Sequence, residues 1–435
     1  MLPSETSVLI IGAGPTGLAA AISLAQQGIE DFIIVDAVVE GQNSSRASAV
    51  HAATLEALDT IGCASPIISK GMIGKGMMFK RNTASFAMAE MEELTAYTRF
   101  PYVLFVPQYS VEEVLNAKLC EFGAQVVRPL RAVTMKGCKG YHGLEVSFET
   151  GEVIRARYVI GADGKQSTVR RLAGISYTEP DSIAVQDSVA QLVIADVVFS
   201  PSKEAHISKS YLTGNVSPAG VFLTIPMAPQ PDPVTGEDED VVKIIFNVPR
   251  SSGPPPSNPS LSYIQEHINM QGPPHLSSDS AVNPHPVRIT KIVWSTRYKL
   301  SSAVAEQFVK RIHNEDGSLG GTVIVIGDAG HTHSPMGGQG MNLGLRDAIL
   351  LGIALKRSIQ DHEENSQELE EWGRSRHSRA LNTIRTTKTL AHFTDHLISQ
   401  NSFVAAVAYW SFWLLTRFRF VKRMNAWRLS GLGNV

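Results

Sequence analysis

The segment GAGPTG at residues 12–17 carries the first group of residues whose types and spacing indicate chemistry. Gly12 allows a tight turn, Gly14 lets the backbone approach a diphosphate, and Gly17 allows a helix to pack closely on a strand. The N-terminus of the helix that follows offers free N–H groups and a partial positive charge to a phosphate. Asp36 lies 24 residues after Gly12, within the range at which an acid accepts hydrogen bonds from a ribose. The pattern predicts a dinucleotide site.

Two strands and a helix must position this loop. Residues 7–11 form an apolar run that predicts a buried strand, and the Ala- and Leu-rich stretch up to about residue 27 predicts a helix. Pro15 and Thr16 stand in its first turn, where a proline is tolerated because no N–H is needed. A second apolar run, residues 31–35, predicts a strand that ends at Asp36. This unit alone does not distinguish NAD, NADP and FAD.

Two later segments end a strand in the same way. Residues 155–174 run from an apolar strand into GADG, which carries Asp163, and then into the start of a helix. Residues 320–348 run from a strand of β-branched residues into GD, a proline turn and a glycine-rich loop, and a helix opens near Met341. Three separate strands therefore each carry one candidate binding segment.

The order and spacing of GAGPTG, GADG and GDAGHTHSPMGGQGMN resemble those of the single-component FAD-dependent aromatic hydroxylases, the flavoprotein monooxygenases of the para-hydroxybenzoate hydroxylase and phenol hydroxylase type. RASAVHAATLEALDTIG at 46–62 and VPQYSVEEVL at 106–115 extend the likeness, which covers most of residues 5–175 and 320–380. The resemblance implies FAD as the cofactor. It also implies NADPH or NADH as co-substrate, bound transiently without a Rossmann unit of its own.

The resemblance assigns FAD contacts residue by residue. The first loop, with Gly12, Gly14, Pro15, Thr16 and Gly17, is expected to hold the diphosphate. Outside that loop, the residues that match the family's cofactor contacts are Asp36, Arg46, Gln108, Asp163, Gly327 and Asp328. Asp36 stands where the family usually has Glu, so its reach toward the ribose is shorter. Asp163 is expected to serve both FAD and the nicotinamide cofactor, and Asp328 to bind the ribityl chain.

The GGQGMN loop supplies the predicted partners of the flavin ring. A reduced flavin carries negative charge around its N1–C2=O edge. The backbone N–H groups of Gly340, Met341 and Asn342, at a helix N-terminus, are expected to stabilise that anion. Gly338 belongs to the same loop, and Pro335 is expected beside the reactive C4a position of the flavin.

Several other kinds of site are excluded by what the chain lacks. His331 and His333 have no acidic or cysteine ligand pattern beside them, so no metal site is predicted. Three widely separated cysteines argue against a disulfide framework and a structural zinc site. No GxSxG nucleophile elbow is present. A net charge of −2 argues against a nucleic-acid partner.

The predicted fold class is α/β: a Rossmann-like FAD-binding domain with an inserted β-rich substrate domain and a C-terminal helical region. A length of 435 residues allows two to three domains. Apolar runs predict strands in the middle of the chain, and 3.6-residue patterns predict helices over residues 54–61, 110–122, 342–358 and 367–390. The predicted boundaries are 1–75, 108–175 and 301–385 for the FAD-binding domain, 76–107 and 176–300 for the substrate domain, and 386–435 for an apolar and basic helical tail.

Charged residues make up 18% of the chain, below the ~25% of an average protein, and two apolar stretches explain part of this. Residues 6–29 have no basic residue before them, so a signal peptide is excluded and the buried strand, turn and helix account for them. Residues 403–415 are shorter than the roughly 17–25 residues that span a bilayer. They predict a helix packed on the core. A segment that contacts a membrane surface through its basic flank stays open as the alternative, so the predicted location is the cytoplasm with or without peripheral membrane contact.

The predicted function is an FAD-dependent monooxygenase that uses NAD(P)H and O₂. The resemblance implies hydroxylation of an aromatic (phenolic) or polyketide- or isoprenoid-type substrate through a C4a-hydroperoxyflavin, as in secondary-metabolite biosynthesis. Two alternatives stay open: other chemistry on the same fold (epoxidation, Baeyer–Villiger oxidation, isoprenoid reduction) and a non-catalytic FAD-binding protein. The catalytic base is not identified; Tyr102, His206 and Tyr211 are candidates by region only.

Overall fold

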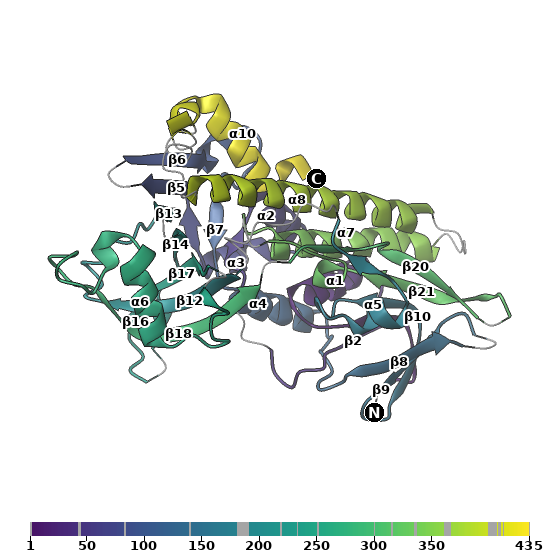
Figure 1. Ribbon diagram of the computed structural model, residues 1–435. Helices are drawn as coiled ribbons and strands as arrows, with labels where there is room; N and C mark the ends of the chain where they lie inside the picture. Colours follow the sequence, from purple (N-terminus) through teal and green to yellow (C-terminus); the bar gives the residue numbers. More distant parts are fainter. Residues whose placement is uncertain are drawn as a thin grey trace.

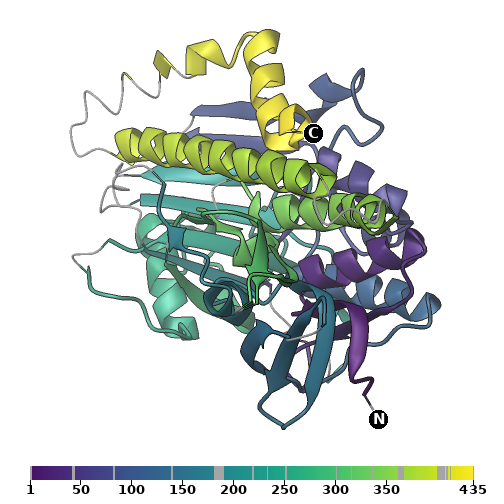
Figure 2. The ribbon, with the colours of Figure 1, turned by 90° about the vertical axis from the view of Figure 1, so that its right-hand side faces the viewer.

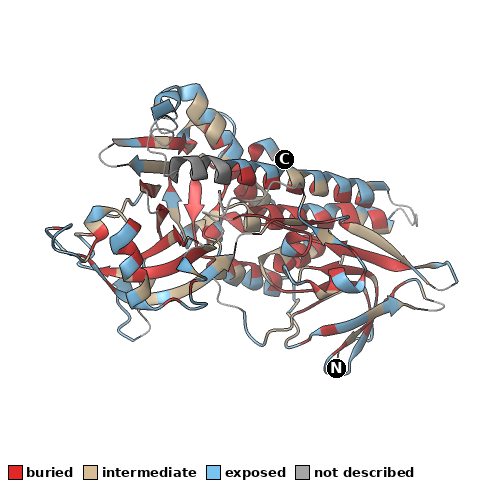
Figure 3. Ribbon diagram, viewed as in Figure 1, coloured by how far each residue is buried: buried red, intermediate tan, exposed pale blue. Residues whose placement is uncertain are grey.

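Two large sheets and a layer of long helices form the architecture of the computed structural model (Figure 1). The residues that the structure describes are 2–41, 45–81, 84–138, 141–180, 191–217, 220–232, 234–249, 252–299, 301–314, 316–334, 337–360, 367–398, 407, 410, 411 and 413–434. The central strands of both sheets and the inner faces of the helices are buried, whereas strands at the sheet margins are partly exposed (Figure 3).

The first sheet has the order β2-β1-β10-β21-β20, with β9 and then β8 added beside β10. Its strands are β1 (Glu5–Ile11), β2 (Phe32–Val35), β8 (Ala132–Gly137), β9 (Leu144–Phe148), β10 (Val153–Gly161), β20 (Val309–His313) and β21 (Leu319–Val325). β2, β1, β10 and β21 are parallel. The predicted α/β fold class is confirmed.

The four parallel strands end in one row. Ile11 is paired with Val35 on one side and with Gly161 on the other, and Gly161 is paired with Val325. The turns after these strands therefore meet at one edge of the sheet, the edge at which open α/β sheets bind ligands. This register is what brings the three predicted binding segments together.

Helices form one hydrophobic core with this sheet. They are α1 (Pro15–Gln26), α2 (Ala52–Thr60), α3 (Ala64–Ser69), α4 (Gln108–Glu121), α5 (Thr168–Leu172), α7 (Gly340–Gln360) and α8 (Gln367–Ile398). α7 packs against α1 through small residues: a Cβ on Gly344 or Gly352 would overlap Thr16 or Ser23. Ser23 Oγ also donates to the Ile349 carbonyl at 2.7 Å. This close packing fixes the N-terminal ends of both helices beside the row of strand ends.

The second sheet has the order β18-β12-β17-β14-β13-β5-β6. Its strands are β5 (Gly76–Arg81), β6 (Ala84–Glu90), β12 (Gln191–Ser200), β13 (Tyr211–Ser217), β14 (Gly220–Pro226), β17 (Val241–Asn247) and β18 (Arg288–Lys299). Only the β13–β5 pair is parallel. Strands from before and after α4 thus share one sheet.

The predicted β-rich region also contains a helix that the sequence analysis missed, α6 (Leu261–Gln271). Ile264 and Ile268 are buried against the second sheet. Ser260 caps the helix, because its Oγ accepts the N–H of Tyr263 at 3.3 Å. The cap and the i, i+4 pair were the available signals, and the adjoining Pro- and Ser-rich loop hid them.

Short elements join the two sheets. Three-stranded sheets are made by β3 (Ala49–Val50), β7 (Val103–Phe105) and β4 (Met72–Gly74), and by β11 (Tyr177–Thr178), β19 (Ala303–Ala305) and β22 (His331–Thr332). The remaining short elements are β15 (Gln230–Pro231), β16 (Asp238–Glu239) and the 3₁₀ turns η1 (Met91–Leu94), η4 (Pro274–Leu276), η5 (Gly327–Ala329) and η6 (Leu432–Asn434).

Two helices define the C-terminal part. α8 runs unbroken for 32 residues and contacts strands of both large sheets, so the predicted boundary between residues 385 and 386 falls inside a helix. α10 (Arg419–Ser430) lies across β6 and η1 (Figure 2). Lys422 Nζ bonds Glu90 Oε1 at 3.0 Å, and Arg419 pairs with Glu93. These two basic residues are therefore held by acidic partners on the protein.

The predicted apolar stretch 403–415 lies mostly outside the described residues. Among those described, Trp410, Leu414 and Leu415 are at least half exposed, whereas Trp413 packs against the β5–β6 side of the second sheet. None of the described helices is both long and apolar enough to cross a membrane. Peripheral membrane contact stays a prediction.

Candidate cofactor and substrate site

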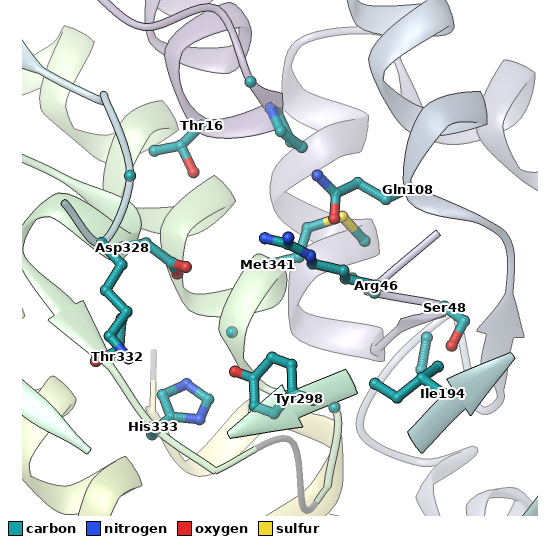
Figure 4. A pocket seen from close by; sticks show the side chains of 18 of the residues that line it. Thr16, Arg46, Ser48, Gln108, Ile194, Tyr298, Asp328, Thr332, His333 and Met341 are labelled. Atoms are coloured by element: carbon teal, nitrogen blue, oxygen red, sulfur yellow. The ribbon is translucent and has the colours of Figure 1, made fainter. Parts of the chain in front are cut away.

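A cavity of about 1330 Å³ lies between the strand ends of the first sheet and one face of the second (Figure 4). Ordinary small-molecule pockets measure roughly 300–1,000 Å³. The volume therefore suits a large cofactor together with a second molecule. Of the residues predicted to bind FAD, those that line the cavity are Gly12, Gly14, Pro15, Thr16, Asp36, Arg46, Gln108, Asp163, Asp328, Gly338, Gly340 and Met341. Gly17, Gly327 and Asn342 lie just behind this lining, and Pro335 lies outside the described residues.

The first glycine loop has a different structural reason for each glycine. Gly12 has φ +106°, and a Cβ on it would overlap the backbone of Ala162. A Cβ on Gly17 would overlap the carbonyl of Gly12. Gly14 has φ −72° and nothing within 4 Å of the position of a Cβ. Gly12 and Gly17 are thus required by the fold, whereas Gly14 leaves the backbone open toward the cavity.

Asp36 stiffens this loop. Its Oδ2 accepts the N–H of Ala13 at 2.6 Å, and its Oδ1 accepts the N–H of Val38 at 2.8 Å. Arg128, which the sequence analysis did not single out, lies 3.4 Å from Oδ1. Each carboxylate oxygen keeps a further lone pair that can accept from a ribose hydroxyl. Asp36 therefore stabilises the backbone around it and also faces the cavity.

Arg46 and Gln108 enter the cavity from neighbouring segments. The backbone N–H groups of Gln108 and Val106 donate to the carbonyls of Ala47 and Ser48 at 3.0 and 3.1 Å. The side chain of Gln108 donates to Glu112 Oε1 at 2.9 Å. Glu112 also lines the cavity, and burial raises its pKa. It is a second polar group that the sequence analysis missed.

Asp163 caps the helix that follows it. Its Oδ2 accepts the N–H groups of Thr168 and Val169 at 2.6 and 3.1 Å. Its Oδ1 is buried and has no hydrogen-bond partner among the described residues. Burial raises the pKa of this carboxyl group above its usual value. A buried acceptor without a partner is costly, so this atom fits a site completed by a donor on a ligand.

Asp328 and Arg46 point toward one another across the cavity (Figure 4). Burial raises the pKa of Asp328, while the charges of His331, Arg46 and Lys165 partly oppose the rise. Its side chain is nevertheless open to the cavity itself. The preceding Gly327 has φ +58°, and a Cβ there would press on Thr16, so only glycine suits the turn that presents Asp328.

The start of α7 is fixed by the side chain of Asn342. Asn342 Nδ2 donates to the carbonyls of Ala49 and Gly338 at 2.8 and 2.6 Å, and its Oδ1 accepts the N–H of His51 at 2.8 Å. The Asn342 side chain therefore orients the helix N-terminus and does not project into the cavity. Gly340 and Met341 line the cavity at this end, as the flavin-anion hypothesis requires.

Two histidines in the cavity wall are held neutral. His51 Nε2 lies 2.8 Å from the carbonyl of Gly337, and His333 Nδ1 lies 3.0 Å from that of Ser334. Each of these nitrogens carries the hydrogen, because a carbonyl can only accept. Burial lowers the pKa of both histidines to about 4. The sequence analysis did not single out His51.

These pKa values predict a loss of stability in mild acid. An unfolded histidine titrates near 6.5, so between pH 6.5 and 4 the unfolded chain binds more protons than the folded one. We expect the free energy of unfolding to fall as pH drops through this window, by up to about 3 kcal/mol per histidine. Urea unfolding of the apoprotein at pH 7, 5.5 and 4.5 measures this. His333→Gln should flatten the profile, and an unchanged profile would contradict the assignment.

His331 lies behind the cavity in a charged cluster. Its Nε2 is 2.6 Å from Asp347 Oδ2, and Arg376 Nε donates to Asp347 Oδ1 at 2.6 Å. All three side chains are buried. Burial acts to raise the pKa of Asp347, but Arg376 and His331 outweigh it and the pKa is lowered. The cluster ties α8 to α7 and to the loop that carries Asp328.

The far end of the cavity is apolar and belongs to the second sheet. The apolar residues that line it include Met77, Phe79, Met88, Leu192, Ile194, Leu212, Val221, Leu223, Ile225, Ile245 and Leu429. Asn247 and Arg297 add polar groups. Tyr298 lines the cavity closer to Asp328 and Arg46, whose charges act on its phenol, and burial raises its pKa to about 12, so the phenol stays protonated. The candidate bases Tyr102, His206 and Tyr211 do not line this cavity.

Leu429 comes from α10, so the C-terminal segment forms part of the cavity wall. Gln339 Nε2 donates to the carbonyl of Leu429 at 2.8 Å, and Arg346 donates to that of Gly431 at 3.1 Å. The loop before α7 and α7 itself thus hold the last helix in place. No spacing in the sequence relates residue 429 to the cavity.

A Rossmann-like sheet whose strand-end loops share one cavity with a second, apolar-faced sheet is the arrangement of a dinucleotide-binding α/β protein. The family model described as FAD binding domain matches residues 5–387. The chain therefore belongs to the FAD binding domain family. The predicted family resemblance is confirmed.

Relatives of known activity are similar over most of the chain. The rifampicin monooxygenase of Streptomyces venezuelae is 27% identical over 354 residues, 81% of this chain and 64% of that protein. The 12-dehydrotetracycline 5-monooxygenase/anhydrotetracycline 6-monooxygenase of Streptomyces rimosus is 28% identical over 402 residues, 89% and 70% of the two chains. The chain thus spans about two thirds of the length of these relatives. The activity class predicted from the sequence is the class of these relatives.

A solved structure shows the same fold over the whole chain. The p-nitrophenol 4-monooxygenase of Pseudomonas putida DLL-E4 superposes with a TM-score of 0.75 at 20% identity, and the match covers 98% of this chain and 99% of that one. At this identity the likeness concerns the fold alone.

Proposed function

We propose that the protein is an FAD-dependent monooxygenase that uses NAD(P)H and O₂ to hydroxylate an apolar aromatic substrate of phenolic or polyketide type. The observation that carries the proposal is the single cavity that joins the three dinucleotide-binding loops to an apolar chamber. Bound FAD would accept reducing equivalents from NAD(P)H and would activate O₂. The monooxygenases that are similar to this chain support the reaction type.

The residues present fit FAD. Gly14 leaves an open backbone at a helix N-terminus, which suits a diphosphate. Asp163 and Asp328 present carboxylates to the cavity, and these accept hydrogen bonds from hydroxyl groups and ring N–H groups. Arg46 offers a cation on the opposite wall. The N-terminus of α7 offers N–H groups to an anion at the other end.

The far end fits an apolar substrate with few polar groups. Its aliphatic and aromatic lining excludes water. This exclusion would protect a reactive oxygen species from side reactions with water. Tyr298 can donate a hydrogen bond from its protonated phenol, and Asn247 can donate or accept. A substrate with a phenolic or carbonyl oxygen could therefore be hydrogen-bonded at this end.

Oxygen and NAD(P)H consumption tests the proposal. Holoprotein is mixed aerobically with NADH or NADPH and with phenol, p-nitrophenol or anhydrotetracycline as probes. We expect oxidation of one nicotinamide to be stimulated by at least one probe, with a hydroxylated product that carries one atom of ¹⁸O from ¹⁸O₂. Bound FAD with no NAD(P)H oxidation under any condition would favour a non-catalytic FAD-binding protein.

A further inference from the structure

A buried ion pair on the second sheet reaches the loop that carries Arg46. Lys243, on β17, has a side chain that is 0% exposed, and Asp196, on β12, one that is 2% exposed. Their Nζ and Oδ1 atoms are 2.5 Å apart. Neither residue lines the cavity, and the functional proposal above assigns no role to either.

The hydrogen bonds of Lys243 point mainly to the loop. An ammonium group has three N–H donors. One donates to Asp196, and the other two donate to the carbonyl and the hydroxyl of Ser45 at 2.6 and 3.0 Å. All three donors are therefore used, and two of them hold a single residue that stands directly before Arg46.

The other side of Arg46 is held by the segment that leads into α4. Ala47 and Ser48 accept backbone hydrogen bonds from the segment that leads into α4. Arg46 thus lies between an anchor from the second sheet at residue 45 and an anchor from the α4 side at residues 47 and 48. Both anchors act on the backbone from which the Arg46 side chain enters the cavity (Figure 4).

A buried ion pair is a poor way to gain stability. Removing two charges from water costs free energy that their attraction only partly returns, and well-packed apolar residues often do as well or better. The pair instead fixes the position of Ser45, because the hydrogen bonds that Lys243 donates to Ser45 are directional. The observation therefore asks for a role in positioning.

We propose that Lys243, with Asp196 as its counter-ion, is a positioning pair for Arg46 in the FAD site. β12 and β17 also carry Ile194 and Ile245, which line the apolar end of the cavity. The strands that form the substrate wall, β12 and β17, are therefore hydrogen-bonded to the loop that carries Arg46. The inference rests on the proposed FAD site and goes beyond it, because it assigns a cofactor role to strands of the substrate side.

Titration of apoprotein with FAD, followed by flavin fluorescence, tests this. Lys243→Met alone leaves Asp196 buried and unpaired, so the main variant is Lys243→Met/Asp196→Leu, which removes both charges. Because it also leaves the buried carbonyl and hydroxyl of Ser45 without their donor, we expect it to fold with a lower unfolding temperature than the wild type and to bind FAD about tenfold more weakly, the effect of losing one charged hydrogen-bonded contact. Lys291→Met removes a more exposed pair on the same sheet, with Asp232 and Glu239, and should not change FAD affinity.

Arg46→Ala separates positioning from a general structural effect. If the pair acts through Arg46, the variant that combines all three substitutions should bind FAD as Arg46→Ala does. Wild-type affinity in Lys243→Met/Asp196→Leu, or effects that multiply in the combined variant, would overturn the inference. Failure of the wild type to oxidise NAD(P)H would reject the proposed function, but it would leave this binding result intact.

Discussion

Purified Asp328→Ala protein is expected to be colourless. Asp328 closes the row of strand-end turns and presents its carboxylate to the cavity opposite Arg46. Its replacement removes an acceptor that faces the cavity and can serve the hydroxyl groups of FAD, and hydrogen bonds to charged groups are worth about 1.5–3 kcal/mol each. The FAD dissociation constant should rise about a hundredfold. The ratio of flavin to protein absorbance after purification measures the loss directly.

The matched control is Asp316→Ala. Asp316 accepts hydrogen bonds from Ser318 in the hairpin between β20 and β21, and it lies on the surface. The Asp316→Ala protein is expected to keep bound FAD and its yellow colour. If Asp328→Ala also kept full FAD and full activity, the assignment of this carboxylate to the cofactor site would be wrong.

Gly14→Ala and Gly12→Ala are expected to fail in different ways. Gly14 has a φ that alanine adopts freely and open space around a Cβ, so Gly14→Ala should fold with an unchanged melting temperature and lose FAD binding. Its methyl group would stand where the diphosphate must approach. Gly12 has a positive φ and no room beside Ala162. Strain and overlap together should cost about 3 kcal/mol or more, so Gly12→Ala should melt earlier.

Circular dichroism and FAD titration on both variants distinguish the two outcomes. Gly123→Ala serves as the comparison for backbone strain alone, because Gly123 has φ +75° with open space around a Cβ and does not line the cavity. Normal FAD affinity in folded Gly14→Ala would place the diphosphate elsewhere.

The cofactor end of the site was predictable because its signals are local. Each of the three segments combines a short apolar strand with a glycine turn or an aspartate, and parallel strands in register bring such turns to one edge. The sequence therefore predicted which residues gather there without any knowledge of the register. The α/β class followed from the same pattern.

The substrate end was not predictable for a physical reason. Its residues come from strands whose alternation is interrupted because both faces are covered, so no periodicity separates cavity positions from core positions. Lys243 and Ser45 are 198 residues apart, and their contact depends on how the second sheet lies against the loop that carries Arg46. Tyr298 and Leu429 reach the cavity through the same long-range packing. The candidate bases chosen by region do not line the cavity.

The position of Leu429 in the cavity wall matters for any attempt to shorten the protein by removing α10. Truncation of α10 looks harmless from its position in the sequence, yet Ala426 and Ser430 are buried, Gly431 accepts a hydrogen bond from Arg346 on α7, and Leu429 lines the cavity. Removing α10 would open the apolar end of the cavity to bulk water and shorten the lifetime of a reactive oxygen species in the cavity. The damage would show as poor coupling, with reducing equivalents spent and little product formed, in a protein that still folds and still carries its colour.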